Sequence, residues 1–270
     1  MADAITAEIV YAVDTGVKLV NQTMPAGNMN RIRTGKYEPQ KMQIRNGRDD
    51  LTRFDINQNG FVLAAHPTQM KDFLDAEELK SVYYPEVQRL VMEQTGASRV
   101  EIFDHTLRSG DEDTRKKKLM REPVRAAHND YTEVSGPRRV REIMPDEAEA
   151  LLSKRFAIVQ VWRAIRNPIV ADPLTMCDSR SFEMSDFLTA ERRYPDRVGE
   201  TYRMTHNPAH EWYYFPKMHR DEALVFKVYD SDTSFPGRFT PHTSFADPAS
   251  PPDAEARESI EVRAFAFFDD

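Results

Sequence analysis

The segment Arg257-Glu258-Ser259-Ile260-Glu261-Val262-Arg263-Ala264-Phe265-Ala266-Phe267 decides the fold class of this chain. Successive side chains of a β-strand point to opposite faces, and here the two faces differ in polarity. One face carries Arg257, Ser259, Glu261, Arg263, Phe265 and Phe267, and the other carries Ile260, Val262, Ala264 and Ala266. We therefore predict a strand whose apolar face packs against another sheet and whose polar face borders a polar interior.

Most other regular segments also have strand character. They are short, rich in β-branched and aromatic residues, and separated by Pro and Gly. They comprise residues 62–65, 99–105, 124–128, 156–165, 201–205, 212–215 and 223–229. Because strands dominate the second half and helices come mainly before them, we predict a mainly β protein with flanking helices. Within this class we expect a double-sheet barrel whose mouth holds the functional site.

Two helices and one turn interrupt this pattern. Apolar residues recur at helical spacing over 76–94, where Pro85 should kink or split the helix and Gly96 should end it. A second helix is predicted over 146–155. Asn59-Gly60 predicts a hairpin turn before residues 62–65. The charged segment 109–121 is expected to be a solvated loop that could order over the pocket as a lid.

Composition limits the classes of partner. The chain has 270 residues, which fits one domain with a substantial core. Its 44 acidic and 37 basic residues give a net charge of -7, which argues against nucleic acid as a partner. The single cysteine, Cys177, fits a reducing compartment and a small buried side chain. No apolar run approaches the roughly 20 residues of a membrane span, so we expect a cytoplasmic protein with no membrane partner. The sequence does not predict the oligomeric state.

The segment His128-Asn129-Asp130 carries the chemistry. Two histidines and one carboxylate are a typical ligand set for ferrous iron that leaves coordination positions open. Residues i and i+2 of a strand share a face, so His128 and Asp130 can reach one ion. A second His-x-Asp occurs at His219-Arg220-Asp221. A barrel needs several strands of about 8 to 12 residues each between the pair and the third ligand. The first pair is preferred because the chain from His128 to His242 has room for these strands, whereas the chain from His219 to His242 does not.

The third ligand must come from the histidines that follow this pair, which are His206, His210, His219 and His242. We choose His242 because Arg257 and Ser259 follow it. An Arg and a hydroxyl on one strand face can bind a carboxylate with three hydrogen bonds, and so anchor a dicarboxylate co-substrate. His219 is then left with a structural or substrate-facing role.

Several short motifs together resemble a known family. They are 127–132 (AHNDYT), 161–163 (VWR), 173–174 (PL), 177–180 (CDSR), 229–231 (YDS), 241–245 (PHTSF) and 257–263 (RESIEVR). In these motifs, which span residue 124 to the C-terminus, the chain resembles the hydroxylase/desaturase group of the iron(II)- and 2-oxoglutarate-dependent oxygenases. One departure is visible, because Ala164 follows Arg163 where the group usually has Pro.

The resemblance implies a double-stranded β-helix, or jelly-roll, core over residues 121–270. Residues 1–120 would then be an extension of helices and strands packed on this core. It also implies Fe(II) on His128, Asp130 and His242, and 2-oxoglutarate bound by Arg257 and Ser259. The reaction would consume O2, release succinate, and hydroxylate, desaturate or cyclise a small specialised metabolite. Further contacts to the substrate or the site are assigned to Tyr131, Arg163, Tyr213, Tyr214, Lys227 and His219.

Three other classes of function compete with this interpretation. A catalytically inactive jelly-roll protein could bind a small molecule without oxidising it. A cupin-like enzyme without redox chemistry is disfavoured, because its usual His-x-His pair does not occur in the sequence. A hydrolase is disfavoured further, because the sequence has neither Gly-x-Ser-x-Gly nor His-Glu-x-x-His.

Overall fold

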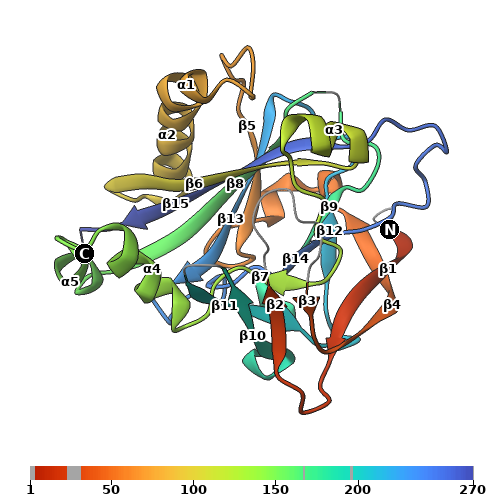
Figure 1. Ribbon diagram of the computed structural model, residues 1–270, viewed down its shortest axis with the longest axis horizontal. Helices are drawn as coiled ribbons and strands as arrows, with labels where there is room; N and C mark the ends of the chain where they lie inside the picture. The colour runs from red at the N-terminus through yellow and green to blue at the C-terminus, as the bar shows by residue number, and fades with distance from the viewer. Residues whose placement is uncertain (1–3, 23–31, 167, 195–196, 270) are drawn as a thin grey trace.

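Two β-sheets face each other and form a half-barrel, with helices outside them (Figure 1). The computed structural model describes residues 4–22, 32–166, 168–194 and 197–269. The larger sheet contains, in spatial order, β1 (Ala4–Val13), β4 (Lys36–Asn46), β12 (Trp212–Tyr214), β9 (Leu174–Cys177), β14 (His242–Ser244), β7 (His128–Asn129), β11 (Val198–Met204), β10 (Phe187–Arg193), β2 (Leu19–Gln22) and β3 (Ile32–Arg33). The smaller contains β5 (Phe61–Ala65), β13 (Glu222–Asp230), β8 (Phe156–Ala164), β15 (Glu258–Phe267) and β6 (Arg99–Ser109). The mainly β jelly-roll prediction is confirmed.

Strand β15 has the two faces that its sequence predicts. Its apolar face, which includes Ile260 and Val262, shares a buried cluster with Val87 and Leu90 of helix α2 (Tyr84–Thr95). The expectation that a second sheet would cover this face is wrong, because an amphipathic helix covers it. The opposite face is buried in the polar interior as predicted, and there Arg263 donates hydrogen bonds to Asp130.

The predicted helix over 76–94 is present and is split near Pro85. It begins as α1 (Ala76–Glu78), continues as a π-helical turn over Leu79–Tyr83, and resumes as α2. Because proline has no N–H to give, a change in hydrogen-bond register just before it is an expected adjustment. Gly96 ends α2 with a φ of 75°, a left-handed conformation that glycine adopts without strain.

The helices after residue 110 depart from prediction. The predicted helix over 146–155 is shorter, as α5 (Ala148–Leu152). Helix α4 (Ser135–Ile143) was not predicted, because Pro137 was assigned to a connection. Pro137 lies in the first turn, where the N–H that proline lacks has no partner within the helix. The charged segment 109–121 contains α3 (Glu112–Lys118), capped by Asp111.

The turn at Asn59-Gly60 is not a hairpin. Strand β5 after it pairs with β13 in the smaller sheet, whereas β4 before it belongs to the larger sheet. The chain therefore changes sheets here, and Gly60 has a φ of 89°. The Asn59 side chain accepts a hydrogen bond from the Asp55 N–H and donates one to Asp178 at 2.7 Å.

Strands from before residue 120 belong to both sheets. Strands β1 and β4 extend the larger sheet beside β12, and β5 and β6 form the edges of the smaller one. Sequence patterns did not predict β1, β2, β3, β4, β9, β10 or β14. The predicted strand over 124–128 is wrong for most of its length, because only His128 belongs to a strand, β7, whereas the other predicted strands are present with bounds that differ by a few residues. Cys177 is buried as predicted. Among the described helices, none is long and apolar enough to cross a membrane.

Candidate active site

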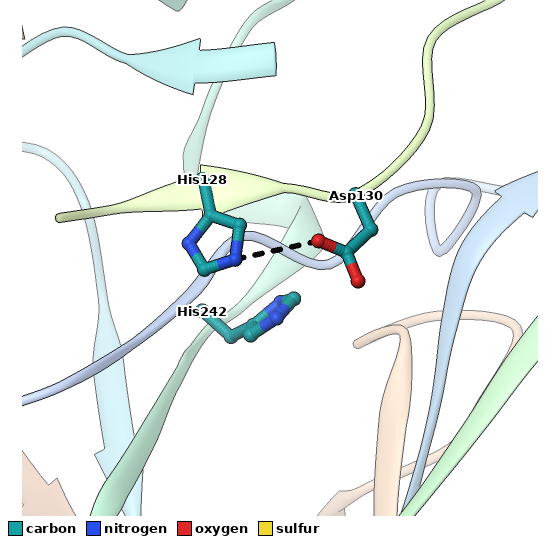
Figure 2. Close-up of side chains that lie close together, drawn as sticks. All are labelled: His128, Asp130 and His242. Carbon is teal, nitrogen blue, oxygen red and sulfur yellow. Dashed lines mark ion pairs between the residues drawn. The ribbon is translucent and has the colours of Figure 1, made fainter. Parts of the chain in front are cut away.

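The site forms where two very short strands meet at the centre of the larger sheet. In the antiparallel pair β7–β14, His128 lies directly opposite His242, so both imidazoles point to the same face. Their ring centroids are 4.5 Å apart. Asp130 follows two residues after His128 and returns to that face, as Figure 2 shows. One ligand atom from each of the three buried residues lies within 4.8 Å of the others, so the group could hold one metal ion.

The backbone orients both imidazoles in the same way. His128 Nδ1 lies 2.8 Å from the carbonyl oxygen of Ala126, and His242 Nδ1 lies 3.0 Å from that of Thr240. A carbonyl oxygen only accepts, so in each ring the proton resides on Nδ1. The lone pair of each Nε2 is therefore left for a metal, and metal-binding histidines usually donate their other ring N–H to a carbonyl oxygen in this way.

The two oxygens of Asp130 have different partners. Oδ2 accepts hydrogen bonds from Gln160 Nε2 at 2.6 Å and from Arg263 Nε and Nη2 at 3.1 and 3.0 Å. Oδ1 lies 3.4 Å from His128 Nε2 (Figure 2). One oxygen thus positions the carboxylate, and the other faces the imidazoles as a ligand atom.

Burial and charge prepare both side chains for a cation. Burial, reinforced by the nearby His242, lowers the pKa of His128 to about 4, so this imidazole is neutral at physiological pH. Burial alone would raise the pKa of Asp130, but the Arg263 charge and His128 outweigh it and hold this pKa well below its usual value. Neither group has to release a proton before it binds a metal at neutral pH.

A narrow cavity leads from the histidines to Arg257. Its lining includes His128, Trp162, His242, Arg257 and Glu261. The Arg257 guanidinium carbon lies 5.4 Å from the centroid of the Trp162 ring, and Arg257 Nη1 donates to the carbonyl of Asp172 at 2.6 Å. Burial, reinforced by the charge of Arg108, lowers the pKa of Arg257 to about 9, which still leaves it charged at neutral pH.

Two buried donors near this cavity are unsatisfied within the described part of the chain. They are Nε of Arg257, which immediately precedes β15, and Oγ of Ser259, which lies on the polar face of β15. Burying a donor without an acceptor costs roughly 1–3 kcal/mol, so such pairs usually have a ligand or water as partner. A carboxylate has the acceptor geometry and the charge that this pair requires.

Tyr131 is the one further predicted contact that lies beside the triad. It borders a second cavity together with Asp130 and Arg263, and its ring makes an edge contact with Phe103. Burial raises the pKa of Tyr131, so its hydroxyl stays protonated at physiological pH.

The other predicted contacts point elsewhere. Arg163 is on the opposite face of β8 from Trp162 and donates to the carbonyls of His66 and Arg220. The Lys227 ammonium is bound by Asp230 at 2.7 Å.

Three more predicted contacts also have partners away from the triad. Tyr213 donates its hydroxyl to Glu211 at 3.0 Å, and the Tyr214 ring packs on Phe245. His219 is exposed in the turn before β13, where its backbone N–H donates to Glu222.

Three residues around the triad were not singled out from sequence, although each had a signal. Gln160 is the only polar residue in the buried run 156–162, and an isolated polar residue in such a strand needs a partner. Glu261 and Arg263 continue the polar face of β15 that begins with Arg257. The Trp162 ring, which carries no polar signal of this kind, is a further wall of the cavity.

Comparisons with known proteins agree with this architecture. The family described as "YDMC: Oxidoreductase/YMDC permease-like domain" matches residues 9–267. The hydroxylase/desaturase efuI of Hormonema carpetanum is 30% identical over 273 residues, covering 90% of this chain and 91% of the relative. The alpha-ketoglutarate-dependent dioxygenase phiK of Fungal sp. (strain ATCC 74256) is 30% identical over 253 residues, covering 91% of each chain. The solved structure of the iron and alpha-ketoglutarate-dependent endoperoxidase NvfI has a TM-score of 0.86 at 24% identity, covering 98% of each chain.

The likeness to NvfI shows that the fold is the jelly-roll of an iron and 2-oxoglutarate oxygenase. The matches over nearly the whole chain go further: this protein belongs to the hydroxylase/desaturase group of the iron(II)- and 2-oxoglutarate-dependent oxygenases. It is an oxidoreductase that acts on small molecules and uses Fe(II), 2-oxoglutarate and O2.

Proposed function

We propose that His128, Asp130 and His242 hold the Fe(II), and that Arg257 and Ser259 bind the distal carboxylate of 2-oxoglutarate. The observation that carries the first assignment is the convergence of three ligand atoms, each oriented by a separate hydrogen bond. The buried donors of Arg257 and Ser259 support the second. The reaction is then hydroxylation, desaturation or ring closure of a small specialised metabolite.

When bound, iron and 2-oxoglutarate supply the chemistry that uses O2 to oxidise a C–H bond, with succinate and CO2 as by-products. The chain contributes orientation and exclusion of water. Arg263 and Gln160 hold Asp130 so that Oδ1 faces the metal position. The two backbone carbonyls keep each Nε2 free of a proton.

Residues of the narrow cavity would position 2-oxoglutarate. A planar guanidinium can give two parallel hydrogen bonds to one carboxylate, and the Ser259 hydroxyl can add a third. The Trp162 ring under Arg257 keeps the guanidinium away from bulk water, where the same ion pair would contribute less. The charge of Arg257 would therefore select a dicarboxylate over a monocarboxylate keto acid.

The test of the metal assignment is anaerobic titration of the metal-free protein with Fe(II) followed by 2-oxoglutarate. We expect the visible charge-transfer band of the chelate to appear in the wild type and to be absent in His242→Ala. His219→Ala is the matched control and should give the wild-type band, because His219 lies in an exposed turn. A band of unchanged intensity in His242→Ala would reject the assignment.

The second assignment predicts a selective defect in Arg257→Ala. The Kd for 2-oxoglutarate should rise roughly 30-fold or more, because removing one partner of a buried charge pair costs about 2 kcal/mol or more. The Kd for Fe(II) should stay within about twofold of the wild-type value, since no metal ligand changes. Arg166→Ala is a control, because Arg166 pairs with Glu258 at 3.1 Å and has an exposed side chain. Equal loss of both affinities in Arg257→Ala would point to a folding role instead.

We also propose that residues 121–270 form the catalytic core, that residues 1–120 pack on it as an extension, and that the enzyme works in the cytoplasm without a nucleic-acid or membrane partner. The net charge of -7 supports the absence of a polyanionic partner. The single buried cysteine is consistent with a reducing compartment.

A further inference from the structure

A second and larger cavity, of about 190 Å³, borders the triad on the side of Asp130. Strand β10, the start of β11 and helix α4 contribute to its walls, and Asp130, Tyr131 and Arg263 lie on its inner side. Its most unusual property is its charge, because six arginines and four carboxylates of the described residues line it. A ligand in this cavity would therefore lie beside the proposed metal site and be surrounded by guanidinium groups.

Most of these charges neutralise one another. Each of the four carboxylates is already paired with an arginine of the lining. The pairs are Arg138–Glu200 at 3.7 Å, Arg139–Glu142 at 2.9 Å, Arg197–Glu142 at 3.7 Å, Arg263–Asp104 at 3.0 Å and Arg263–Asp130 at 3.0 Å. Arg121 and Arg192 remain, and neither has a carboxylate partner within the described residues.

Arg192 is the more informative of the two, because its side chain is only partly exposed. Its Nε is buried and has no acceptor among the described residues. The neighbouring Arg193 is on the other face of β10, where it pairs with Glu191 at 2.7 Å. The two adjacent arginines thus differ: Glu191 neutralises the charge of Arg193 on the outer face of β10, whereas Arg192 on the inner face has no carboxylate partner among the described residues.

Arg203 adds a third guanidinium to the same face. In the β10–β11 pair, Arg203 lies opposite Leu188, four residues before Arg192, so both arginines point to the same side of the sheet. In the β11–β7 pair it lies opposite His128. Arg203 is 6% exposed, and its buried Nε also has no acceptor among the described residues.

Arg121 is an exposed residue at the mouth, where the chain leaves helix α3. An exposed arginine needs no partner, so Arg121 is relevant only because it lies at this cavity. Although the residue as a whole is exposed, partial enclosure of its guanidinium and the nearby Arg192 charge lower the pKa of Arg121, so the two like charges lie close together. Arg121 and Arg192 therefore line this cavity, and Arg203 lies on the same face of the sheet as Arg192, opposite His128.

The charge balance shows that the known co-substrates do not neutralise these groups. Around the triad, four of the described arginines are buried, namely Arg108, Arg203, Arg257 and Arg263. They face three carboxylates, which are the buried Asp130 and Glu261 and the more exposed Asp104 that pairs with Arg263. The two positive charges of Fe(II) and the two negative charges of 2-oxoglutarate cancel each other. The excess of positive charge remains, and a buried charge without a counterion is costly.

We propose that the small-molecule substrate is an organic acid whose carboxylate binds Arg192 of this cavity and Arg203 on the same face of the sheet, with Arg121 at the entrance. The inference rests on the proposed function, since it assumes that the C–H bond to be oxidised lies near Asp130. Fork-shaped donors suit a planar carboxylate. This anchor would fix the distance between the acid group and the oxidised carbon, so the regiochemistry would be set from the acid end of the substrate.

The test compares two probes of equal shape and different charge, benzoate and benzamide. Binding is measured by isothermal titration calorimetry on protein loaded anaerobically with Fe(II) and saturating 2-oxoglutarate, which occupies the Arg257 site. The wild type should bind benzoate about tenfold or more tightly than benzamide, as expected for charge-assisted hydrogen bonds. Arg192→Gln and Arg203→Gln should each reduce the preference severalfold, and Arg193→Gln should keep it.

The relaxation rate of the benzoate ring protons tests independently whether the probe lies near the metal position. It should be faster with Fe(II) than with Zn(II) in the same site, because only Fe(II) is paramagnetic. Equal or undetectable binding of the two probes by the wild type overturns the proposal, as does an unchanged preference in both Arg192→Gln and Arg203→Gln. A raised Kd for 2-oxoglutarate in these variants, with benzoate binding unchanged, would assign the arginines to the co-substrate. Each result assumes that the visible chelate band forms, and its failure would count against the proposed function instead.

Discussion

The chain contains two His-x-Asp segments, and the fold gives them opposite environments. His128 and Asp130 lie at the centre of the larger sheet, with exposures of 7% and 9%. His219 and Asp221 are exposed in the turn before β13. The two segments have the same spacing and the same residue types, so their chemistry is decided by position alone.

The difference lies in what surrounds each carboxylate. Asp130 is oriented by Arg263 and Gln160 from the facing sheet, and a second histidine lies across the strand pair from His128. Asp221 uses its backbone carbonyl to accept the His66 N–H, and solvent reaches its side chain. A ligand motif becomes a site where another sheet supplies partners that fix its geometry.

Exchanging one carboxylate for a methyl group in each segment should give the largest contrast. Asp130→Ala removes one of the three proposed ligands, so we expect it to abolish substrate-dependent succinate formation and the visible chelate band. Asp221→Ala should retain both within about twofold of the wild type, because an exposed side chain away from special features contributes little. Succinate is measured by chromatography, and the far-ultraviolet circular dichroism of both variants should match the wild type. Turnover in a folded Asp130→Ala variant would contradict the ligand set.

The second contrast concerns the arginines that accompany the two segments. Arg263→Gln leaves Asp130 and Glu261 buried with less neutralisation, so we expect the free energy of unfolding to fall by about 3–5 kcal/mol. Fe(II) affinity should also fall by roughly 10- to 100-fold, as for other residues that orient metal ligands. Arg220→Gln, which removes a bond to the Met70 carbonyl, should lower stability less and leave Fe(II) affinity unchanged. Denaturant titration and anaerobic Fe(II) titration at low temperature measure the two quantities.

The fold class and the convergence of His128, Asp130 and His242 were predictable because both depend on local patterns. The alternation along 257–267 defines a strand with two different faces, whatever its partners are. His128 and Asp130 share a face because of their spacing, and the length of chain before His242 leaves room for the barrel strands. Each of these inferences needs only the geometry of one strand or a count of residues.

The rest depended on contacts between distant parts of the chain. Strand β14 has three residues and β7 has two, so their pairing is stabilised by the whole sheet and has no pattern of its own. The covering of β15 by α2 and the change of sheet at Gly60 also depend on tertiary contacts. Arg163 was misplaced for the simplest reason: it shares a strand with Trp162 and Gln160, but Trp162 and Gln160 point into the barrel and Arg163 does not.

Gln160 allows the most sensitive test of how strongly residues of the facing sheet orient Asp130 in the buried His-x-Asp segment. Gln160→Leu keeps the volume close to that of the original side chain and removes one of three hydrogen bonds to Asp130 Oδ2, while Arg263 still holds the carboxylate. A single hydrogen bond contributes about 1 kcal/mol, so Fe(II) affinity should fall by only about 2- to 10-fold. Gln88→Leu is the matched control, because Gln88 donates to the Val100 carbonyl in another part of the protein. If both substitutions changed Fe(II) affinity equally, the effect would be one of general stability, and Arg263 alone would account for the orientation of Asp130.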